Sequence, residues 1–135
     1  MTYAASVRRF LSPDSLPTPF GYSHVVDASA ARLIFVSGQV PLDREGQLVG
    51  AGDFEAQARQ VFDNLTKALA AADASWADVV KLSYFLTDVN EIGSVRAIRD
   101  EYVNTESPPA STLVEVSSLF RDDVLIEIDA VAIAE

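Results

Sequence analysis

The spacing of hydrophobic and polar positions changes several times along the chain and separates strands from helices. Short runs rich in Val, Ile, Leu, Phe and Tyr, bounded by clusters of Pro, Gly, Asp or Ser, are typical of β-strands. Prolines at positions 13, 17 and 19 indicate a loop after the first run, because proline withholds its N–H from a ladder. The sequence predicts six strands, over residues 5–11, 23–28, 33–39, 79–86, 112–117 and 124–133.

Two further segments carry a helical period. Over residues 53–72 apolar side chains recur at spacings of three and four, and Asp53 is a suitable N-cap. Residues 75–78 have the form of a capping box, which predicts a short helical turn before the fourth strand. A second capping signature begins an amphipathic helix over residues 89–103. The order βββαβαββ predicts one α+β domain over residues 1–135, with a mixed sheet of about six strands and both helices on one face.

The second face of this sheet is apolar as well. Two helices of this length cover one face only, so the other face of a monomer should be polar. In the last predicted strand, however, Ile126 and Ile128 point to one side, while Leu125 and Val131 share the opposite side with Glu127. An uncovered apolar face of this size is rare on a soluble monomer. We therefore expect this face to pack against symmetry-related copies of the chain.

Composition narrows the classes of partner and compartment. With 20 acidic and 10 basic residues the formal net charge is -10, which repels phosphate backbones and excludes nucleic acid as an expected partner. The chain has no cysteine and a single histidine, His24, so neither a thiolate nucleophile nor a metal site is expected. No apolar run reaches the roughly 20 residues of a membrane span. We expect a soluble cytoplasmic protein that does not bind membranes.

Several polar residues are candidates for chemistry. Gly38 allows backbone to approach a ligand closely, and Ser37 places a hydroxyl beside it, although a Ser-Gly pair also ends ordinary strands. Tyr22 offers a phenol or, alternatively, a packing anchor. Glu127 lies between two isoleucines, and burial raises the pKa of a carboxyl toward the range useful for proton transfer. We expect the carboxylates of Glu115, Glu127 and Asp129 to converge; the alternative is that they are solvated or paired with Lys81 and arginines.

A set of short segments, taken in chain order, resembles the RidA (YjgF) family, also labelled the endoribonuclease L-PSP family. Any one segment is weak, but the ordered set is specific and covers nearly the whole chain. The segments are Tyr22-Ser23, Val36-Ser37-Gly38-Gln39, Pro41-Leu42-Asp43, residues 56–65, Val79-Val80-Lys81, Phe85-Leu86-Thr87-Asp88, Pro109-Ala110, Val114-Glu115-Val116 and Ile126-Glu127-Ile128.

The resemblance implies both an assembly and an activity. It implies a chorismate-mutase-like subunit in a homotrimer, with a central sheet barrel, helices outside and a small-molecule cleft at each subunit interface. Active members hydrolyse reactive enamines and imines, such as 2-aminoacrylate, to 2-keto acids and ammonia without a metal or organic cofactor. By position, Tyr22 and Glu127 would be the catalytic residues. Substrate would be bound by Ser37, Gly38, Ser111 and Leu113.

One position departs from the family pattern. The deaminases carry an arginine where this chain has Ser111, and a neutral hydroxyl cannot reproduce the bidentate grip of a guanidinium on a carboxylate. Its loss costs about 1.5 to 3 kcal/mol of binding, which argues against 2-imino acids such as 2-aminoacrylate. Arg96, where relatives commonly have asparagine, is a substrate-binding candidate that supplies a displaced charge; the alternative is a solvated arginine paired with Glu91 or Asp100. Arg121, in a turn one residue longer than usual, is a second candidate.

Three functions are consistent with these residues. The first is a deaminase-like hydrolase in which Glu127 and an ordered water act on an imine or another small electrophile, which lacks a carboxylate or is held by Arg96. The second is a small-molecule-binding trimer without turnover. The third, a ribonuclease, needs a basic groove that this acidic chain does not provide.

Overall fold

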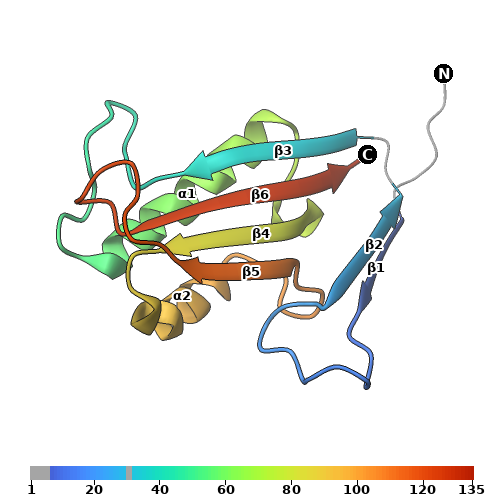
Figure 1. The fold of residues 1–135 in the computed structure, drawn as a ribbon. Coiled ribbons are helices and arrows are strands. Elements are labelled where there is room, and N and C mark those ends of the chain that lie inside the picture. Colours follow the sequence, from blue (N-terminus) through green and yellow to red (C-terminus); the bar gives the residue numbers. More distant parts are fainter. Residues whose placement is uncertain (1–6, 30–31) are drawn as a thin grey trace.

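The computed structural model describes residues 7–29 and 32–135, which form an α+β fold with two helices lying against one face of a four-stranded sheet (Figure 1). The strands are β1 (Val7–Leu11), β2 (Val25–Ser29), β3 (Arg32–Gln39), β4 (Val79–Leu86), β5 (Ala110–Glu115) and β6 (Ile126–Ala134). The helices are α1 (Phe54–Ala71) and α2 (Ile92–Arg99), each joined to the sheet through a short 3₁₀ turn, η1 (Trp76–Asp78) and η2 (Val89–Glu91).

All six predicted strands are present, but they are divided between two sheets. The main sheet has the order β3-β6-β4-β5, in which β6 is antiparallel to both neighbours and β4 and β5 are parallel. β1 and β2 pair with each other and lie to one side (Figure 1). Arg8 joins this pair to the main fold, since its Nη1 donates to Asp78 Oδ1 at 3.0 Å and to the carbonyl of Ile133 at 2.7 Å. Residues 5 and 6 of the first predicted strand lie outside the described residues.

The register of β3 against β6 slips where the Ser-Gly pair occurs. Val36 pairs with Ala130 and Gln39 with Ile128, so Ser37 and Gly38 form an irregular segment of the ladder. Such bulges bend a strand and redirect its side chains. The result is that Gly38 lies against a side chain of the neighbouring strand, as described below.

The first helix begins where its cap predicts, because Asp53 Oδ1 accepts a hydrogen bond from the N–H of Ala56 at 3.1 Å. The second predicted helix is shorter than residues 89–103. Its α-helical part ends at Arg99, whose carbonyl accepts from the N–H groups of both Tyr102, at 2.9 Å, and Val103, at 3.0 Å. Shared acceptors of this kind are the tightened last turn of a helix, so the apolar stripe continues to Tyr102 although the helix does not.

The main core lies between the helices and one face of the sheet. Phe62 of α1 stacks on Tyr102 with ring centroids 5.0 Å apart, and Tyr84 and Ile128 are buried beneath them. The other face is bare, as Figure 1 shows, and it exposes 57% of Leu33 and 74% of Phe35. The prediction that both sheet faces are substantially apolar is confirmed. None of the helices in the described part of the chain combines the length and apolar character that a bilayer crossing requires.

Candidate functional site

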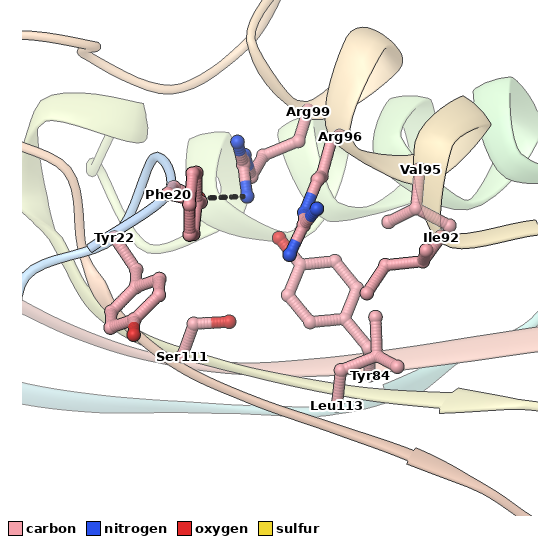
Figure 2. A pocket seen from close by; sticks show the side chains of 9 residues that line it. All are labelled: Phe20, Tyr22, Tyr84, Ile92, Val95, Arg96, Arg99, Ser111 and Leu113. Atoms are coloured by element: carbon pink, nitrogen blue, oxygen red, sulfur yellow. Dashed lines mark hydrogen bonds between the residues drawn. The ribbon is translucent and has the colours of Figure 1, made fainter. Parts of the chain in front are cut away.

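A pocket of about 230 Å³ opens between α2, the edge strand β5 and the loop that precedes β2 (Figure 2). Four of the predicted site residues line it, namely Tyr22, Arg96, Ser111 and Leu113. The remaining lining residues are Phe20, Tyr84, Ile92, Val95 and Arg99. The structure therefore brings together four of the predicted residues with five that the sequence did not point out.

Strand register brings Ser111 and Leu113 into the pocket. In the parallel pairing of β4 and β5, Ser111 lies beside Leu82 and Leu113 beside Tyr84. Leu82 and Tyr84 are both buried under the helices, so the two β5 side chains point to the same side of the sheet. Figure 2 shows the Ser111 hydroxyl directed into the pocket.

The loop that carries Tyr22 is tied to the start of β5 by its neighbour Ser23. The Ser23 N–H donates to the carbonyl of Pro109 at 3.2 Å, and the Ser23 hydroxyl donates to the carbonyl of Pro108 at 2.6 Å. Tyr22 packs edge-on against His24, with ring centroids 5.2 Å apart. His24 Nε2 lies 2.7 Å from the carbonyl of Pro17, a structural contact within the loop.

Arg96 belongs to the pocket. Its guanidinium carbon lies 5.6 Å from the centroid of the Phe20 ring, a cation–π distance. Within the described residues no ion pair joins Arg96 to Glu91 or Asp100, because the Asp100 carboxylate pairs with Arg99 instead. Arg96 thus lines the pocket while remaining exposed, without the ion pair to Glu91 or Asp100 that the alternative expected, and its role in substrate binding stays a prediction.

Arg99 is a pocket residue that the sequence did not point out. Only 7% of it is exposed, and both Nε and Nη2 lie 3.0 Å from Asp100 Oδ1. Its Nη1 approaches the carbonyl of Phe20 at 3.5 Å. A usable signal existed, since Ile92, Val95 and Arg99 share one helix face at spacings of three and four residues.

Tyr84 forms the inner wall. The residue is 2% exposed, and its hydroxyl has no hydrogen-bond partner among the described residues. Burial raises the pKa of the Tyr84 phenol well above its usual value, and the positive charge of Arg99 opposes that rise only in part. The phenol is therefore neutral and able to donate a hydrogen bond.

Ser37, Gly38 and Glu127 lie on the bare face of the sheet, away from this pocket. Glu127 pairs with Phe85 across the ladder and covers Gly38, where a β-carbon would come within 2.4 Å of Glu127 Oε2. The Glu127 carboxylate therefore occupies the space that a side chain at position 38 would take. Within one chain, the predicted cleft is thus split between two sheet faces.

The predicted convergence of carboxylates is wrong for a single chain. Leu86 pairs with both Glu115 and Ile126, which puts Glu115 on the helix side and Glu127, one residue further along, on the bare side. Glu115 Oε1 accepts instead from the N–H of Val89 at 2.9 Å. The alternation of side chains within each strand does not show which residues of two neighbouring strands share a sheet face, because that depends on the register between the strands.

The remaining candidates lie elsewhere. Arg121 makes a two-point ion pair with Asp123, at 3.0 and 2.7 Å, and does not line the pocket. This pair raises the pKa of Arg121 and lowers the pKa of Asp123 from their usual values. In residues 7–29 and 32–135 no three or more His, Cys, Asp or Glu side chains are grouped so as to hold a metal ion.

Comparison with known proteins gives consistent results. A family model described as Endoribonuclease L-PSP matches residues 14–134. Protein DfrA of Myxococcus xanthus is 38% identical over 128 residues, which cover 94% of this chain and 96% of DfrA. The 2-iminobutanoate/2-iminopropanoate deaminase of Mus musculus is 37% identical over 129 residues, covering 94% of this chain and 92% of the relative. Among solved structures, YyfB of the conserved Rid protein family from Yersinia pestis superposes with a TM-score of 0.83 at 32% sequence identity. The match covers 93% of this chain and 98% of the YyfB chain.

Proposed function

The chain belongs to the RidA (YjgF) family, whose family model is described as Endoribonuclease L-PSP, and from this premise we propose that it is a cofactor-independent hydrolase of small imines or enamines. Two kinds of support exist. Relatives in mouse and, at 33% identity, Escherichia coli are named 2-iminobutanoate/2-iminopropanoate deaminase. The pocket is small, apolar on one wall and lined by hydroxyl and guanidinium groups, which suits a short polar substrate.

The proposed reaction adds water to a C=N bond. The carboxylate of Glu127 takes one proton from water as the water oxygen attacks the imine carbon, and passes it to the nitrogen. The hydroxyl of the resulting carbinolamine gives up the second proton to the nitrogen as the C=O bond forms, the C–N bond breaks and ammonia leaves. A carbonyl compound is the other product, so one imine and one water give one carbonyl and one ammonia. The phenol of Tyr22 donates to the developing charge, and Ser37, Gly38, Ser111, Leu113 and Arg96 bind the substrate.

The observation that carries the proposal is that the predicted catalytic and substrate-binding residues are divided between the two faces of the sheet. Tyr22 and Ser111 lie on the helix side near the β5 edge, whereas Gly38 and Glu127 lie on the bare side. The two halves can meet only between copies of the chain. We infer that packing of the bare, apolar faces sets the β5 edge of one copy against the bare face of the next, and the family resemblance implies that three copies close this arrangement into a ring.

The assembly is tested by the mass of the native protein in solution. We expect a mass three times that of the 14.6 kDa chain. Phe35→Lys places a charge on the bare face and should yield single subunits, whereas Ala70→Lys, on an exposed position of α1, should leave the mass unchanged. A native mass equal to one subunit would exclude an intersubunit cleft.

The reaction is tested by generating imines in the presence of the protein and measuring release of keto acid and ammonia. Amino-acid oxidation supplies the imine, and the rate in excess of spontaneous hydrolysis is the signal. Replacement Glu127→Gln should reduce this excess about 100-fold or more, since general acid–base groups contribute roughly 10²–10⁴ in rate. Native protein without any excess rate would contradict the proposal.

A second function, a trimer that binds small molecules without turnover, is favoured by one observation. Ser111 stands where the family deaminases carry an arginine, so their carboxylate contact is missing from β5. The variant Ser111→Arg, assayed beside the native protein, separates the two functions. An inert native protein and an active variant would indicate that binding alone is the native function.

A further inference from the structure

We propose that Arg99, with Arg96 and the phenol of Tyr84, forms a carboxylate-binding site, so that α2 rather than β5 supplies the anchor for a small organic acid. The inference rests on the proposed function, because it names the substrate class of the same pocket. It adds two residues, Arg99 and Tyr84, and assigns the main charge contact to Arg99.

The charge of the pocket points to an anionic ligand. Two of its lining residues are arginines, and among the described residues none that lines it carries a carboxylate. This local excess occurs in a chain of net charge -10, where cations are half as numerous as anions. Asp100 contacts Arg99, but the Asp100 side chain is 48% exposed, so solvent screens the electrostatic attraction between its carboxylate and the guanidinium.

The hydrogen bonds of Arg99 leave donors for a ligand. A guanidinium has five N–H groups in a planar fork that matches the two oxygens of a carboxylate. Asp100 engages Nε and Nη2, whereas Nη1 has only the Phe20 carbonyl, at 3.5 Å, which is longer than an ordinary hydrogen bond. Figure 2 shows the Arg99 side chain extending from α2 toward Phe20 and the Arg96 side chain extending from α2 toward Tyr84.

The hydroxyl of Tyr84 supplies the second, independent observation. A buried polar group without a partner is uncommon in folded proteins and calls for an explanation. In Figure 2 the Tyr84 hydroxyl points away from the sheet, toward the two arginines. Because the phenol is a neutral donor without a partner in the described part of the chain, a carboxylate oxygen is a suitable acceptor for it.

The size of the pocket limits the acid. Its volume of about 230 Å³ is below the 300–1,000 Å³ typical of sites for drug-sized ligands. A nucleotide or a peptide is too large, whereas a keto or imino acid of a few carbons fits. The apolar side chains of Ile92, Val95 and Leu113 then contact the hydrocarbon part of the acid.

The experiment measures binding to the full-length protein by calorimetry, with two probes that differ only in charge. The acid is 2-oxobutanoate, and the neutral control is its amide, 2-oxobutanamide. In Arg99→Met the affinity for the acid should fall about 10- to 100-fold, the value of a hydrogen bond to a charged group, while the affinity for the amide is unchanged. Arg59→Met, which removes a surface arginine paired with Glu101, should alter neither.

Two further variants keep the test valid if Arg99→Met does not fold. Tyr84→Phe removes only an unpartnered hydroxyl, so the fold is retained, and the affinity for the acid should fall about 5-fold. Arg99→Lys keeps the charge but not the planar fork, and should bind the acid more weakly than the native protein. A purely structural role of Arg99, holding the loop at Phe20, predicts equal losses for acid and amide.

The outcomes separate this inference from the proposed hydrolase. If 2-oxobutanoate does not bind saturably to the native protein, or if acid and amide are affected equally, the carboxylate site is wrong. If the acid binds in a manner that depends on Arg99 but the protein hydrolyses no imine, the carboxylate site is supported and the proposed hydrolase activity is wrong. If Arg99→Met hydrolyses imines at the native rate, the proposed role of Arg99 as carboxylate anchor is wrong, whereas the proposed hydrolase activity is unaffected.

Discussion

The backbone of Gly21 lies directly against the guanidinium of Arg99. A β-carbon at position 21 would come within 2.0 Å of Nη2 and 2.7 Å of Cζ of Arg99. Gly21 also has a φ of +77°, a conformation that other residues adopt with strain. Arg99 can be buried beside the pocket only because position 21 lacks a side chain.

Replacing Gly21 by alanine should therefore disturb both stability and ligand binding. We expect the free energy of unfolding to fall by more than the roughly 1 kcal/mol of left-handed strain, and the affinity for 2-oxobutanoate to fall with it. Urea unfolding and calorimetry measure the two effects. Gly46→Ala is the matched control, since φ is +78° there and nothing lies within 4 Å of the added carbon. Equal losses in both variants would show that contact with Arg99 has no role.

Gly38→Ala should separate activity from stability. The added carbon would meet the end of the flexible Glu127 side chain, which can move away at little cost in folding free energy. Displacing the carboxylate by an ångström should reduce imine hydrolysis about 100-fold. The assay of keto acid release, with thermal unfolding beside it, checks both parts. Gly93→Ala, in open space on α2, should leave the rate unchanged.

Gln57 should be among the most sensitive positions for stability. It is fully buried on α1; its Nε2 donates to the carbonyls of Gly50, at 3.1 Å, and Asp123, at 2.9 Å, and its Oε1 accepts from the N–H of Leu125 at 2.9 Å. Gln57→Leu leaves these three backbone groups without partners and should lower the free energy of unfolding by about 2–4 kcal/mol.

Urea unfolding of Gln57→Leu is compared with Gln60→Leu. The Gln60 amide donates only to the Asn64 side chain, at 2.9 Å, so its removal should cost about 1 kcal/mol or less. Similar losses in the two variants would contradict the role assigned to Gln57 in joining α1 to both loops.

The buried phenol of Tyr84 predicts a loss of stability in alkali. Its pKa is raised in the folded protein, above the ordinary value of 10.0, so between these two values the unfolded chain releases a proton that the folded chain keeps. Stability must then fall as pH rises above about 10, by up to about 1.4 kcal/mol per pH unit. Urea unfolding of the native protein and Tyr84→Phe at several alkaline pH values measures the difference. Parallel curves for the two proteins would refute the prediction.

Local signals in the sequence predicted the elements well. Apolar spacing and the cap at Asp53 define α1 to within a residue or two, because both act over a few neighbouring positions. The end of α2 was missed, since an apolar residue such as Tyr102 can reach the core from a turn as well as from a helix. The division of six strands into two sheets depends on long-range pairing, which periodicity does not encode.

The sequence predicted part of the pocket lining but not how the predicted residues are divided over the sheet. Tyr22, Arg96 and Ser111 do line one pocket, but Glu127 faces the other side of the sheet. The register between β4 and β6, which the sequence pattern does not give, decides which face Glu127 occupies. Arg99 escaped notice for a related reason. The spacing on α2 puts Arg99 on the same face as Ile92 and Val95, but its burial depends on the space left by Gly21, which is distant in sequence.

The paired hydrogen bonds of Ser23 to the carbonyls of Pro108 and Pro109 have a consequence for ligand capture. They fasten the loop carrying Phe20 and Tyr22 to the two prolines that directly precede β5, and the stiff proline pair restricts both segments. Two adjoining walls of the cavity are thus preorganised as one unit. A small acid entering it orders little additional chain, so most of the contact free energy remains available as affinity.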